Sequence, residues 1–281
     1  MKTFAIISDI HSNLAALQAV LGDIAKRGID EIVCLGDIIG YGPNPRECID
    51  LVREKCRLCI MGNHDHAVLY EPTNFNSAAE RAAYWTRRVL ESEPDRRLRN
   101  QRWEFLGSLG VRAKLEDILF VHASPRRPIN EYIFPEDVFT NPQKVIANFD
   151  RLDAHLCFVG HTHQPGVFLD DPYFDPPNEL PDSPYFVVED ERAIINVGSV
   201  GQPRDRDARA SYVIVHPCNN GDPDEQVAAP GRGSLVAQAL RCSVEQIEFV
   251  RLEYDIDDTA RRIFEEPELD DLLGHRLYEG R

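Results

Sequence analysis

The sequence lacks long apolar segments. Its apolar runs, such as residues 3–8, are far shorter than the roughly 20 residues that a membrane-spanning helix needs. The run near the N-terminus is also too short for the apolar region of a secretory signal peptide. We therefore expect a cytoplasmic protein that does not enter a membrane.

Cationic residues are scarce relative to anionic ones. The chain has 31 Lys and Arg residues against 47 Asp and Glu residues, which gives a formal net charge of −16. This balance opposes non-specific binding to nucleic acid or to an anionic membrane, because each phosphate contact needs a cation. A local basic pocket for one small phosphate stays compatible with it, and carboxylates can also hold metal ions. We expect a small-molecule substrate and leave the oligomeric state open.

Cysteines are few and irregularly spaced. The chain has seven, and Cys56–Cys59 forms a CxxC without the second CxxC that a four-thiolate zinc site requires. We interpret these residues as reduced thiols beside a strand. With 281 residues, 43% of them hydrophobic, the chain is long enough for a substantial core. No convincing linker divides it, so we expect a single domain over residues 1–281.

The first half alternates short apolar runs with helical spacing. Strands are expected at residues 3–8, 31–35 and 57–61, with helices at 13–27 and 43–54 between them. This alternation predicts a parallel sheet with right-handed crossovers. A mostly helical stretch at residues 76–109 is expected to cover one face.

The second half is richer in strands. The pattern predicts a helix at about 135–148, a final helical segment at about 257–275, and strands at 112–115, 117–122, 155–160, 166–169, 185–188, 193–197, 211–215 and 246–254. From residue 166 onward, the short strands separated by turns favour antiparallel pairing. Two Pro-, Gly- or Asp-rich segments, near 170–184 and 218–237, are expected to be inserted surface loops. The fold class is therefore α/β with an α+β-like second half.

Residues that can bind a metal lie just after five of the expected strands. Four strands end at Gly or Ser and the fifth ends directly at a histidine; the residues at these ends are Asp9, His11, Asp37, Asn63, His64, His122, His161 and His163. In sheets built from β-α-β units, ligands bind where strands deliver their carboxyl ends. The five segments therefore predict one shared site.

Four of these residues also have an ordinary explanation when each is taken alone. Asp9 could cap a helix or form a turn, His122 could be a hydrogen-bonded core histidine, and Asp37 and Asn63 could be turn residues. A separate explanation of this kind would be needed at all five strand ends. One shared metal site explains the residues at all five ends together. Asp, His and Asn without cysteine suit Mn, Fe, Zn, Co or Ni.

The number of candidate ligands favours two ions. Seven exceed what one tetrahedral ion needs, and two ions about 3.5–4 Å apart can fix a phosphoryl group and activate water. On an extended backbone, which we expect here, His161 and His163 would lie on the same side about 6.6 Å apart, and this spacing suits two neighbouring ions. Sharing ligands between two ions needs a bridging carboxylate, for which Asp37 is the candidate.

These blocks resemble the calcineurin-like metallophosphoesterase superfamily, whose pattern is D-x-H, G-D, G-N-H-[DE], H and G-H-x-H in this order. Every block is present between Asp9 and His163. The resemblance implies a four-layer αββα sandwich of two mixed β-sheets with helices on the outer faces. It also implies two divalent transition-metal ions, with manganese favoured.

The resemblance further assigns a role to each residue. Asp9, His11 and His163 would hold one metal, Asn63, His122 and His161 the other, and Asp37 would bridge them. His64 would face the substrate, stabilise the phosphoryl oxygens together with Asn63, and protonate the leaving group. A metal-bound hydroxide would attack in line, without a covalent enzyme intermediate.

The residues just after the G-D block indicate the branch of the superfamily. Protein Ser/Thr phosphatases continue with an Asp-Arg pair, whereas this chain has Gly40 and Tyr41. Residues 37–43 and 196–204 look more like the small bacterial and archaeal phosphodiesterases. Arg204 could supply the missing phosphate contact or be a surface arginine. Tyr41 could stack on a base or aromatic ester, or pack within its loop.

We therefore expect a phosphodiesterase that hydrolyses small phosphodiesters, with nucleotides among the candidates. A phosphomonoesterase, a dinucleoside polyphosphate hydrolase and a Ser/Thr protein phosphatase stay open as alternatives within the same chemistry. A non-catalytic metal-binding scaffold on the same fold is the alternative of another class. Such a scaffold should have eroded ligands, whereas all seven candidate ligands and His64 are intact here.

Overall fold

The computed structural model describes residues 1–177, 185–187, 191–218 and 244–281. The described residues form two six-stranded sheets. The first has the order β3-β2-β1-β11-β12-β9, with β1 at Phe4–Ile7, β2 at Glu31–Cys34, β3 at Leu58–Cys59, β9 at Tyr185–Phe186, β11 at Ala210–Pro217 and β12 at Val244–Leu252. The second has the order β4-β5-β6-β10-β7-β8, with β4 at Arg112–Leu115, β5 at Ile118–Val121, β6 at Leu156–Val159, β7 at Gly166–Leu169, β8 at Tyr173–Asp175 and β10 at Ala193–Asn196.

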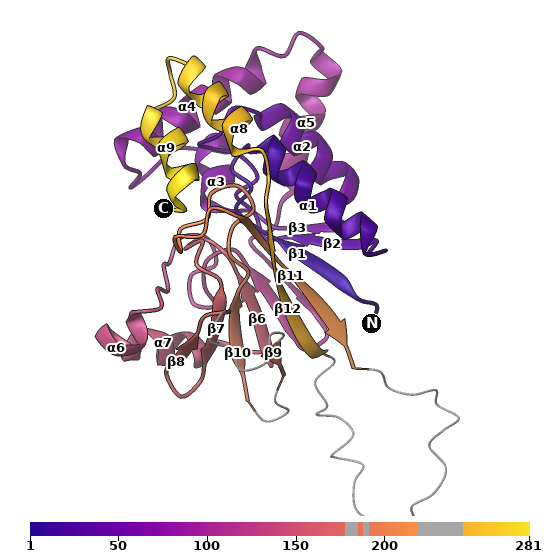
Figure 1. Ribbon diagram of the computed structural model, residues 1–281, viewed down its shortest axis with the longest axis vertical. Coiled ribbons are helices and arrows are strands. Elements are labelled where there is room, and N and C mark those ends of the chain that lie inside the picture. Colours follow the sequence, from indigo (N-terminus) through magenta and orange to yellow (C-terminus); the bar gives the residue numbers. More distant parts are fainter. Residues whose placement is uncertain (178–184, 188–190, 219–243) are drawn as a thin grey trace, which may run out of the picture.

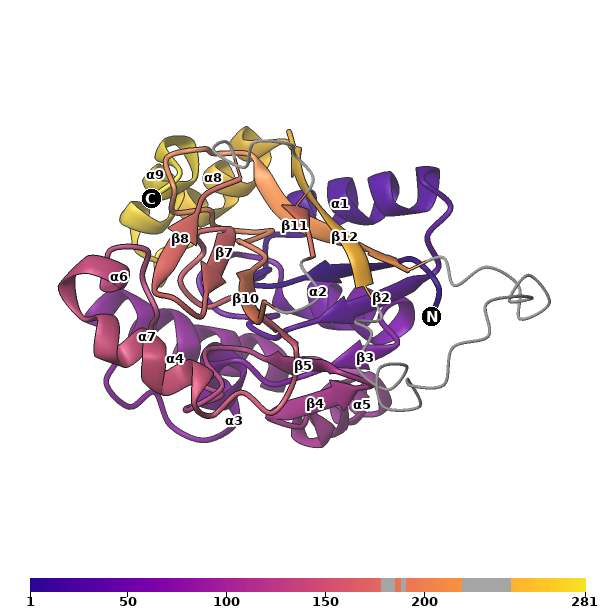
Figure 2. The same ribbon diagram turned by 90° about the horizontal axis from the view of Figure 1, so that it is seen from below.

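Helices lie outside both sheets. They are α1 at Leu14–Lys26, α2 at Pro45–Lys55, α3 at Asn63–Leu69, α4 at Ser77–Glu91, α5 at Arg96–Ser108, α6 at Asp137–Thr140, α7 at Pro142–Phe149, α8 at Ile256–Glu265 and α9 at Asp271–Glu279. Seen from below, α1 lies outside the first sheet and α6 and α7 lie outside the second (Figure 2). The expected four-layer sandwich of two mixed sheets is confirmed.

Strands β1, β5 and β6 are apolar throughout because both of their faces are buried. Along β1, Phe4 and Ile6 join the core between the two sheets, while Ala5 and Ile7 join the core under the helices. β5 and β6 alternate in the same way between the inter-sheet core and the core under α7. Successive side chains of a strand point to opposite faces, so a strand with a core on each side reads as a continuous apolar run.

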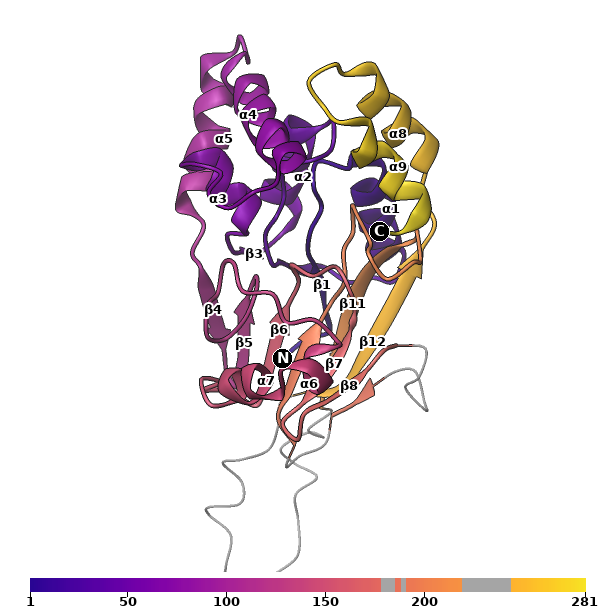
Figure 3. The same ribbon diagram turned by 90° about the vertical axis from the view of Figure 1, so that its left-hand side faces the viewer.

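Strand direction decides where the site can form. β1, β2 and β3 pair in parallel, as the sequence predicts, and β5, β6 and β10 form a second parallel set. For the strands from residue 166 onward, the predicted antiparallel pairing is confirmed for β7, β11 and β12. It is wrong for β10, which pairs in parallel with β6. Residues 160–192 connect these two strands and are long enough for the return that a parallel pairing needs. The carboxyl ends of both parallel sets point toward the end where most helices gather (Figure 3).

Two predicted helical stretches are each divided in two. The stretch at 76–109 forms α4 and α5, and the final stretch at 257–275 forms α8 and α9. Pro94 and Pro267 lie in the breaks, and a helix usually ends before a proline. The C-terminal pair α8–α9 packs against α4 through Ala82, Trp85 and Ile263, among others, although these helices are far apart in the sequence (Figure 1).

Of the two predictions of inserted surface loops, the first is partly wrong. Within 170–184, Tyr173–Asp175 is strand β8, which pairs antiparallel with β7 at the edge of the second sheet. Phe174 supports this strand, since its ring packs on Phe168 of β7. Residues 178–184 and, apart from Cys218, the segment 218–237 lie outside the described residues. No helix in the described ranges has both the length and the apolar character to cross a bilayer.

Phe158 lies in the core between the two sheets, and we expect its substitution to lower the stability of the protein strongly. Its side chain is fully buried and stacks on Phe120, with ring centroids 5.9 Å apart. We expect Phe158→Ala to lower the free energy of unfolding by about 3–5 kcal/mol, because it removes buried contacts and leaves a cavity. Urea unfolding monitored by circular dichroism measures it. Phe139→Ala is the matched control, since Phe139 is 81% exposed, and a comparable loss in that variant would contradict the argument.

Candidate metal centre

The structure brings all seven predicted ligands to one end of the two sheets. Asp9 and His11 follow β1, Asp37 follows β2, and Asn63 begins α3 just after β3. From the second sheet, His122 follows β5, and His161 and His163 follow β6. Their side chains gather in overlapping groups whose ligand atoms lie within 4.8 Å of one another. The carboxyl ends of two facing parallel sets of strands therefore build the centre together.

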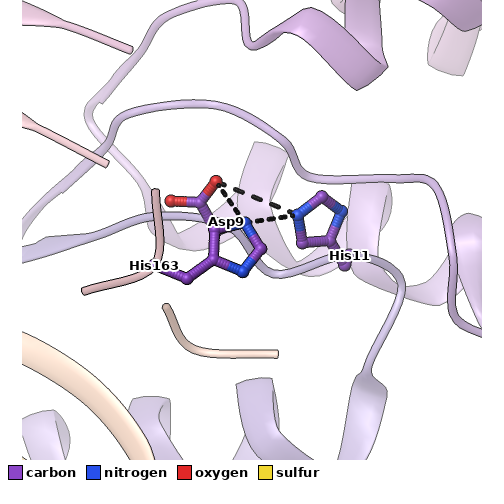
Figure 4. Close-up of side chains that lie close together, drawn as sticks. All are labelled: Asp9, His11 and His163. Carbon is purple, nitrogen blue, oxygen red and sulfur yellow. Dashed lines mark hydrogen bonds and ion pairs between the residues drawn. The ribbon is translucent and has the colours of Figure 1, made fainter. Parts of the chain in front are cut away.

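Asp9, His11 and His163 form the first group (Figure 4). The Nε2 atoms of His11 and His163 are 3.1 Å apart, and Asp9 Oδ1 is 3.2 Å from His163 Nε2 and 3.9 Å from His11 Nε2. All three residues are buried, and Asp9 Oδ1 has no hydrogen-bond partner within the described part of the chain. A buried carboxylate oxygen without a donor, facing two imidazole nitrogens, fits a divalent cation.

Asp37, Asn63, His122 and His161 form the second group. His122 Nε2 lies 3.4 Å from Asp37 Oδ2 and 3.1 Å from Asn63 Oδ1. His161 Nε2 is buried and, among the residues described, has no hydrogen-bond partner. Asp37 Oδ2 is also 3.6 Å from His11 Nε2 in the first group. The same carboxylate oxygen therefore faces both groups.

The backbone at this centre adopts an uncommon conformation. Asp9, His11, Asp37, His161 and His163 all have positive φ, between 49° and 65°. Each such residue other than glycine costs about 1–3 kcal/mol, and this strain gathers at functional sites. Backbone hydrogen bonds between the segments after β1 and β2 hold it, including Asp9 N to Gly36 O and His11 N to Asp37 O.

Gly62 allows the segments to approach this closely. A Cβ at Gly62 would lie 2.1 Å from Asp37 Oδ1 and 2.2 Å from Asp37 N, so only glycine fits. The Asp65 carboxylate accepts hydrogen bonds from the backbone N–H groups of Gly62, Ile38 and Ile39. It thereby fixes both the start of α3 and the loop that carries Asp37.

Two of the imidazoles are oriented by backbone carbonyls. His122 Nδ1 donates to Leu35 O at 2.9 Å, and His163 Nδ1 donates to Gln202 O. A donor Nδ1 leaves the Nε2 lone pair free to face a metal, which is how proteins commonly orient ligand histidines. The His161 ring instead stacks on Tyr132, with centroids 3.9 Å apart and planes inclined by 26°.

The electrostatics suit cation binding at most positions. Burial raises the pKa of the Asp9 carboxyl, but His163 and His122 outweigh it and hold this pKa below its usual range. Burial also lowers the pKa of His11 and His161 well below that of a free imidazole. Ionised carboxylates and neutral imidazoles are the forms that bind metal ions.

His122 is the exception. Burial lowers its pKa, but the negative charge of Asp37 outweighs burial and raises the pKa of His122 to about 9. Without an ion, the negative charge of Asp37 favours the protonated form of this imidazole. A cation at this position would neutralise the same carboxylate charge, so it competes with that proton.

His64, the predicted catalytic residue, lies beside both groups. Its backbone N–H donates to Asp37 Oδ1 at 2.7 Å, and its ring lies against Tyr41 and Phe75, at centroid distances of 4.3 and 4.7 Å. A Cβ at Gly40 would lie 2.5 Å from His64 Nδ1, so glycine at that position makes room for the ring. One ring nitrogen also reaches His11 and Asp37 closely enough to act as a ligand.

Arg204 faces this centre rather than a carboxylate partner. Its guanidinium lies 5.8 Å from the centroid of Tyr41, and it donates to Gln202 Oε1 at 2.8 Å. In the ranges that the structure describes, no carboxylate lies within ion-pair distance of it, and its Nε is buried without a partner. Burial is the main cause of the lowered pKa of His163, and the positive charge of Arg204 is the next.

Tyr41 packs in the interior of the protein and also lies beside the metal centre. Its side chain is only 7% exposed and packs with helices α4, α8 and α9. The same ring lies against His11 and His64, at centroid distances of 4.7 and 4.3 Å. Tyr132 and Phe75 also line the centre and are absent from the sequence-based prediction. Phe75 stands alone among polar residues, whereas Tyr132 is followed by Ile133 and Phe134, and neither pattern points to the metal centre.

The geometry agrees with known relatives of the chain. Residues 2–165 match the family model described as calcineurin-like phosphoesterase. The chain is 38% identical to protein MJ0912 of Methanocaldococcus jannaschii, and the alignment covers 99% of this chain and 98% of that protein. It is 36% identical to a metallophosphoesterase from Sphaerobacter thermophilus, with a TM-score of 0.74 and coverage of 100% of this chain and 99% of the other.

A further solved structure shares the fold. Protein PH1004 of Pyrococcus horikoshii OT3 is 19% identical, with a TM-score of 0.68 over 100% of this chain and 99% of the other. The family match covers more than half of the chain and includes all seven candidate ligands together with His64. The chain thus belongs to the calcineurin-like phosphoesterase family and is a metal-dependent phosphoester hydrolase.

Proposed function

We propose that the protein hydrolyses small phosphodiesters with two divalent transition-metal ions, of which manganese is favoured. The observation that carries the proposal is the position of Asp37. Its Oδ2 lies 3.6 Å from His11 Nε2 and 3.4 Å from His122 Nε2, one nitrogen in each ligand group. A carboxylate between two ligand groups is what a pair of ions needs in order to share a ligand.

The roles that we assign to the residues are those that the family resemblance implies. The first ion would be held by Asp9, His11 and His163 and the second by Asn63, His122 and His161, with Asp37 between them. When bound, the two ions would lower the pKa of a water molecule and neutralise charge on the phosphoryl group. His64 and Asn63 would contact phosphoryl oxygens, and His64 would give a proton to the departing ester oxygen.

The cationic side chains favour a diester over substrates of higher charge. A phosphodiester carries one negative charge, and Arg204 is the guanidinium that lies beside the ligand groups, against the ring of Tyr41, whereas the exposed Arg127 lies at the edge of a neighbouring cavity. A phosphomonoester or a dinucleoside polyphosphate carries more negative charge and would call for more cations. A protein phosphatase is disfavoured by Gly40 and Tyr41, which stand where that branch has an Asp-Arg pair.

A metal-supplemented hydrolysis screen tests the proposal. It compares bis-p-nitrophenyl phosphate, p-nitrophenyl phosphate, cyclic nucleotides, dinucleoside polyphosphates and a phosphopeptide, each with Mn²⁺, Fe²⁺, Zn²⁺, Co²⁺ and Ni²⁺. We expect the highest kcat/KM with a diester. A higher kcat/KM with a monoester, a dinucleoside polyphosphate or the phosphopeptide would contradict the proposal. It would instead indicate a phosphomonoesterase, a dinucleoside polyphosphate hydrolase or a protein phosphatase, respectively. Absence of turnover with every metal would favour a non-catalytic scaffold.

Arg204 gives a prediction on substrate binding. We expect Arg204→Ala to lower kcat/KM for a diester by roughly tenfold to a hundredfold, which is the range for losing a charge-assisted hydrogen bond. Arg204→Lys should recover part of this loss, because the charge is kept but the planar fork is lost. Steady-state kinetics measure both. The control is Arg206→Ala, an exposed neighbour, and equal losses at the two positions would contradict a specific contact.

A further inference from the structure

A cavity of about 410 Å³ opens beside the second ligand group. Its lining includes Asn63 and His161, so the cavity is continuous with the metal centre. The rest of the lining comes from two segments, residues 66–75 around the end of α3 and residues 127–132 after β5, together with Val111. The volume falls in the lower part of the range of about 300–1,000 Å³ that is typical of small-molecule sites. It has room for one small organic group next to a phosphoryl group on the ions.

Two aromatic rings line this cavity where it meets the reactive residues. Tyr132 stacks on the ring of His161, and yet its side chain is 41% exposed. Phe75 is half-buried and lies 4.7 Å from the ring of His64. The catalytic role proposed above involves His64 and the ligands, and it uses neither aromatic residue. Tyr132 also stacks on Phe134, with ring centroids 5.3 Å apart, and the exposed part of such a ring pair is a surface on which a flat group can pack.

The rim of the cavity is polar and carries one cation, Arg127, and one anion, Glu71, which lies 3.8 Å from Arg87 outside the cavity lining. Asn74 and Asn130 are exposed and contribute side-chain amides, which both donate and accept hydrogen bonds. Arg127 is exposed and, in the described residues, has no carboxylate at ion-pair distance, unlike its neighbour Arg126, which pairs with Glu131. Asparagine and arginine side chains match the donor and acceptor edges of nucleobases.

We propose that this cavity binds a nucleobase carried by one ester arm of the substrate. Aromatic rings beside the ions and amide and guanidinium groups at the rim suit a flat aromatic group with polar edges. An alkyl or simple sugar arm would leave the rings and the rim unused. The formal charge of −16 also disfavours a long nucleic acid, so a mononucleotide-sized arm is the fitting ligand. Hydrolysis of the bound ester rests on the proposed function, whereas binding of the base does not.

Calorimetric titration of the manganese-loaded protein tests base binding without turnover. The first probe is an AMP analogue in which a methylene replaces the 5′ bridging oxygen, so that it cannot be hydrolysed. The second probe is its base-free ribose counterpart. We expect the base to tighten binding about tenfold or more, since a stacked base contributes that much or more in other proteins. Tyr132→Leu should remove most of this difference, whereas Tyr132→Phe should keep it because the ring is retained.

The outcomes separate base binding from hydrolysis. Equal affinity for the two probes, or an unchanged difference in Tyr132→Leu, would overturn the proposed base site. The manganese content of each variant is measured in parallel. If Tyr132→Leu loses metal, Asn130→Ala at the rim decides instead, and a base contribution that it leaves unchanged overturns the base site. A base preference together with no hydrolysis of any ester would refute the proposed function and support the base site.

Discussion

Replacing Asp37 with asparagine is expected to empty both metal positions and to reduce hydrolysis to background. Asparagine keeps the size of the side chain, and it tolerates the positive φ of 50° at this position. It also keeps an oxygen that can accept from His64 N–H, which lies 2.7 Å from Asp37 Oδ1. The substitution therefore removes mainly the negative charge that faces His11 and His122.

The size of the effect depends on the position of that charge. Losing a group that only orients a metal ligand costs about 10- to 100-fold in metal affinity. Asp37 is placed to contact the ions themselves and to serve both groups, so we expect a loss of more than 100-fold. Mass spectrometry of metal content after dialysis should give about two manganese ions per chain for the natural sequence and fewer than one for Asp37→Asn.

A surface carboxylate provides the control for Asp37→Asn. Asp153→Asn changes a carboxylate that is 60% exposed and lies far from the centre, paired with Arg112, so its metal content should not change. Retention of both ions in Asp37→Asn would show that Asp37 is not a ligand. Retention of one ion would assign Asp37 to a single group and would leave the two-ion arrangement without its shared ligand.

The metal centre could be predicted from sequence because its ligands follow strands in parallel sets. A parallel strand places its carboxyl end at a known edge, so Asp9, Asp37 and His122 could be brought together from sequence order alone. The fold class was predictable for a related reason, since strands buried on both faces give short continuous apolar runs. Both predictions use patterns of neighbouring residues, which can be read from one sequence alone.

Contacts between distant loops were not predictable in this way. Tyr132 stacks on His161 and Phe75 contacts His64, but neither aromatic residue has a spacing that points to its partner. The parallel pairing of β10 with β6 also depends on where the chain returns after β7 and β8. Helix α3 is not evident in the sequence, because it begins with the site residues Asn63 and His64 and its seven residues are too few to show a helical stripe.

Replacing His64 with glutamine is expected to lower kcat by about 10²- to 10⁴-fold while both metal ions stay bound. This is the usual contribution of a general acid, and glutamine fills much of the space between Tyr41 and Phe75. His64 is buried, and burial is the main reason that its pKa is lowered to about 4 in the absence of substrate. A phosphoester anion beside the ring favours the protonated form, so the proton becomes available when substrate binds.

The leaving group distinguishes this role from the alternatives. If His64 protonates the departing oxygen, the loss in His64→Gln should be large for diesters that release an alkoxide. It should be much smaller for diesters that release p-nitrophenolate, which departs without a proton. His275→Ala, at an exposed histidine of α9, should change neither rate. An equal loss for all leaving groups would place His64 on the phosphoryl oxygens only, and a loss of metal would make it a ligand, as its reach to His11 and Asp37 allows.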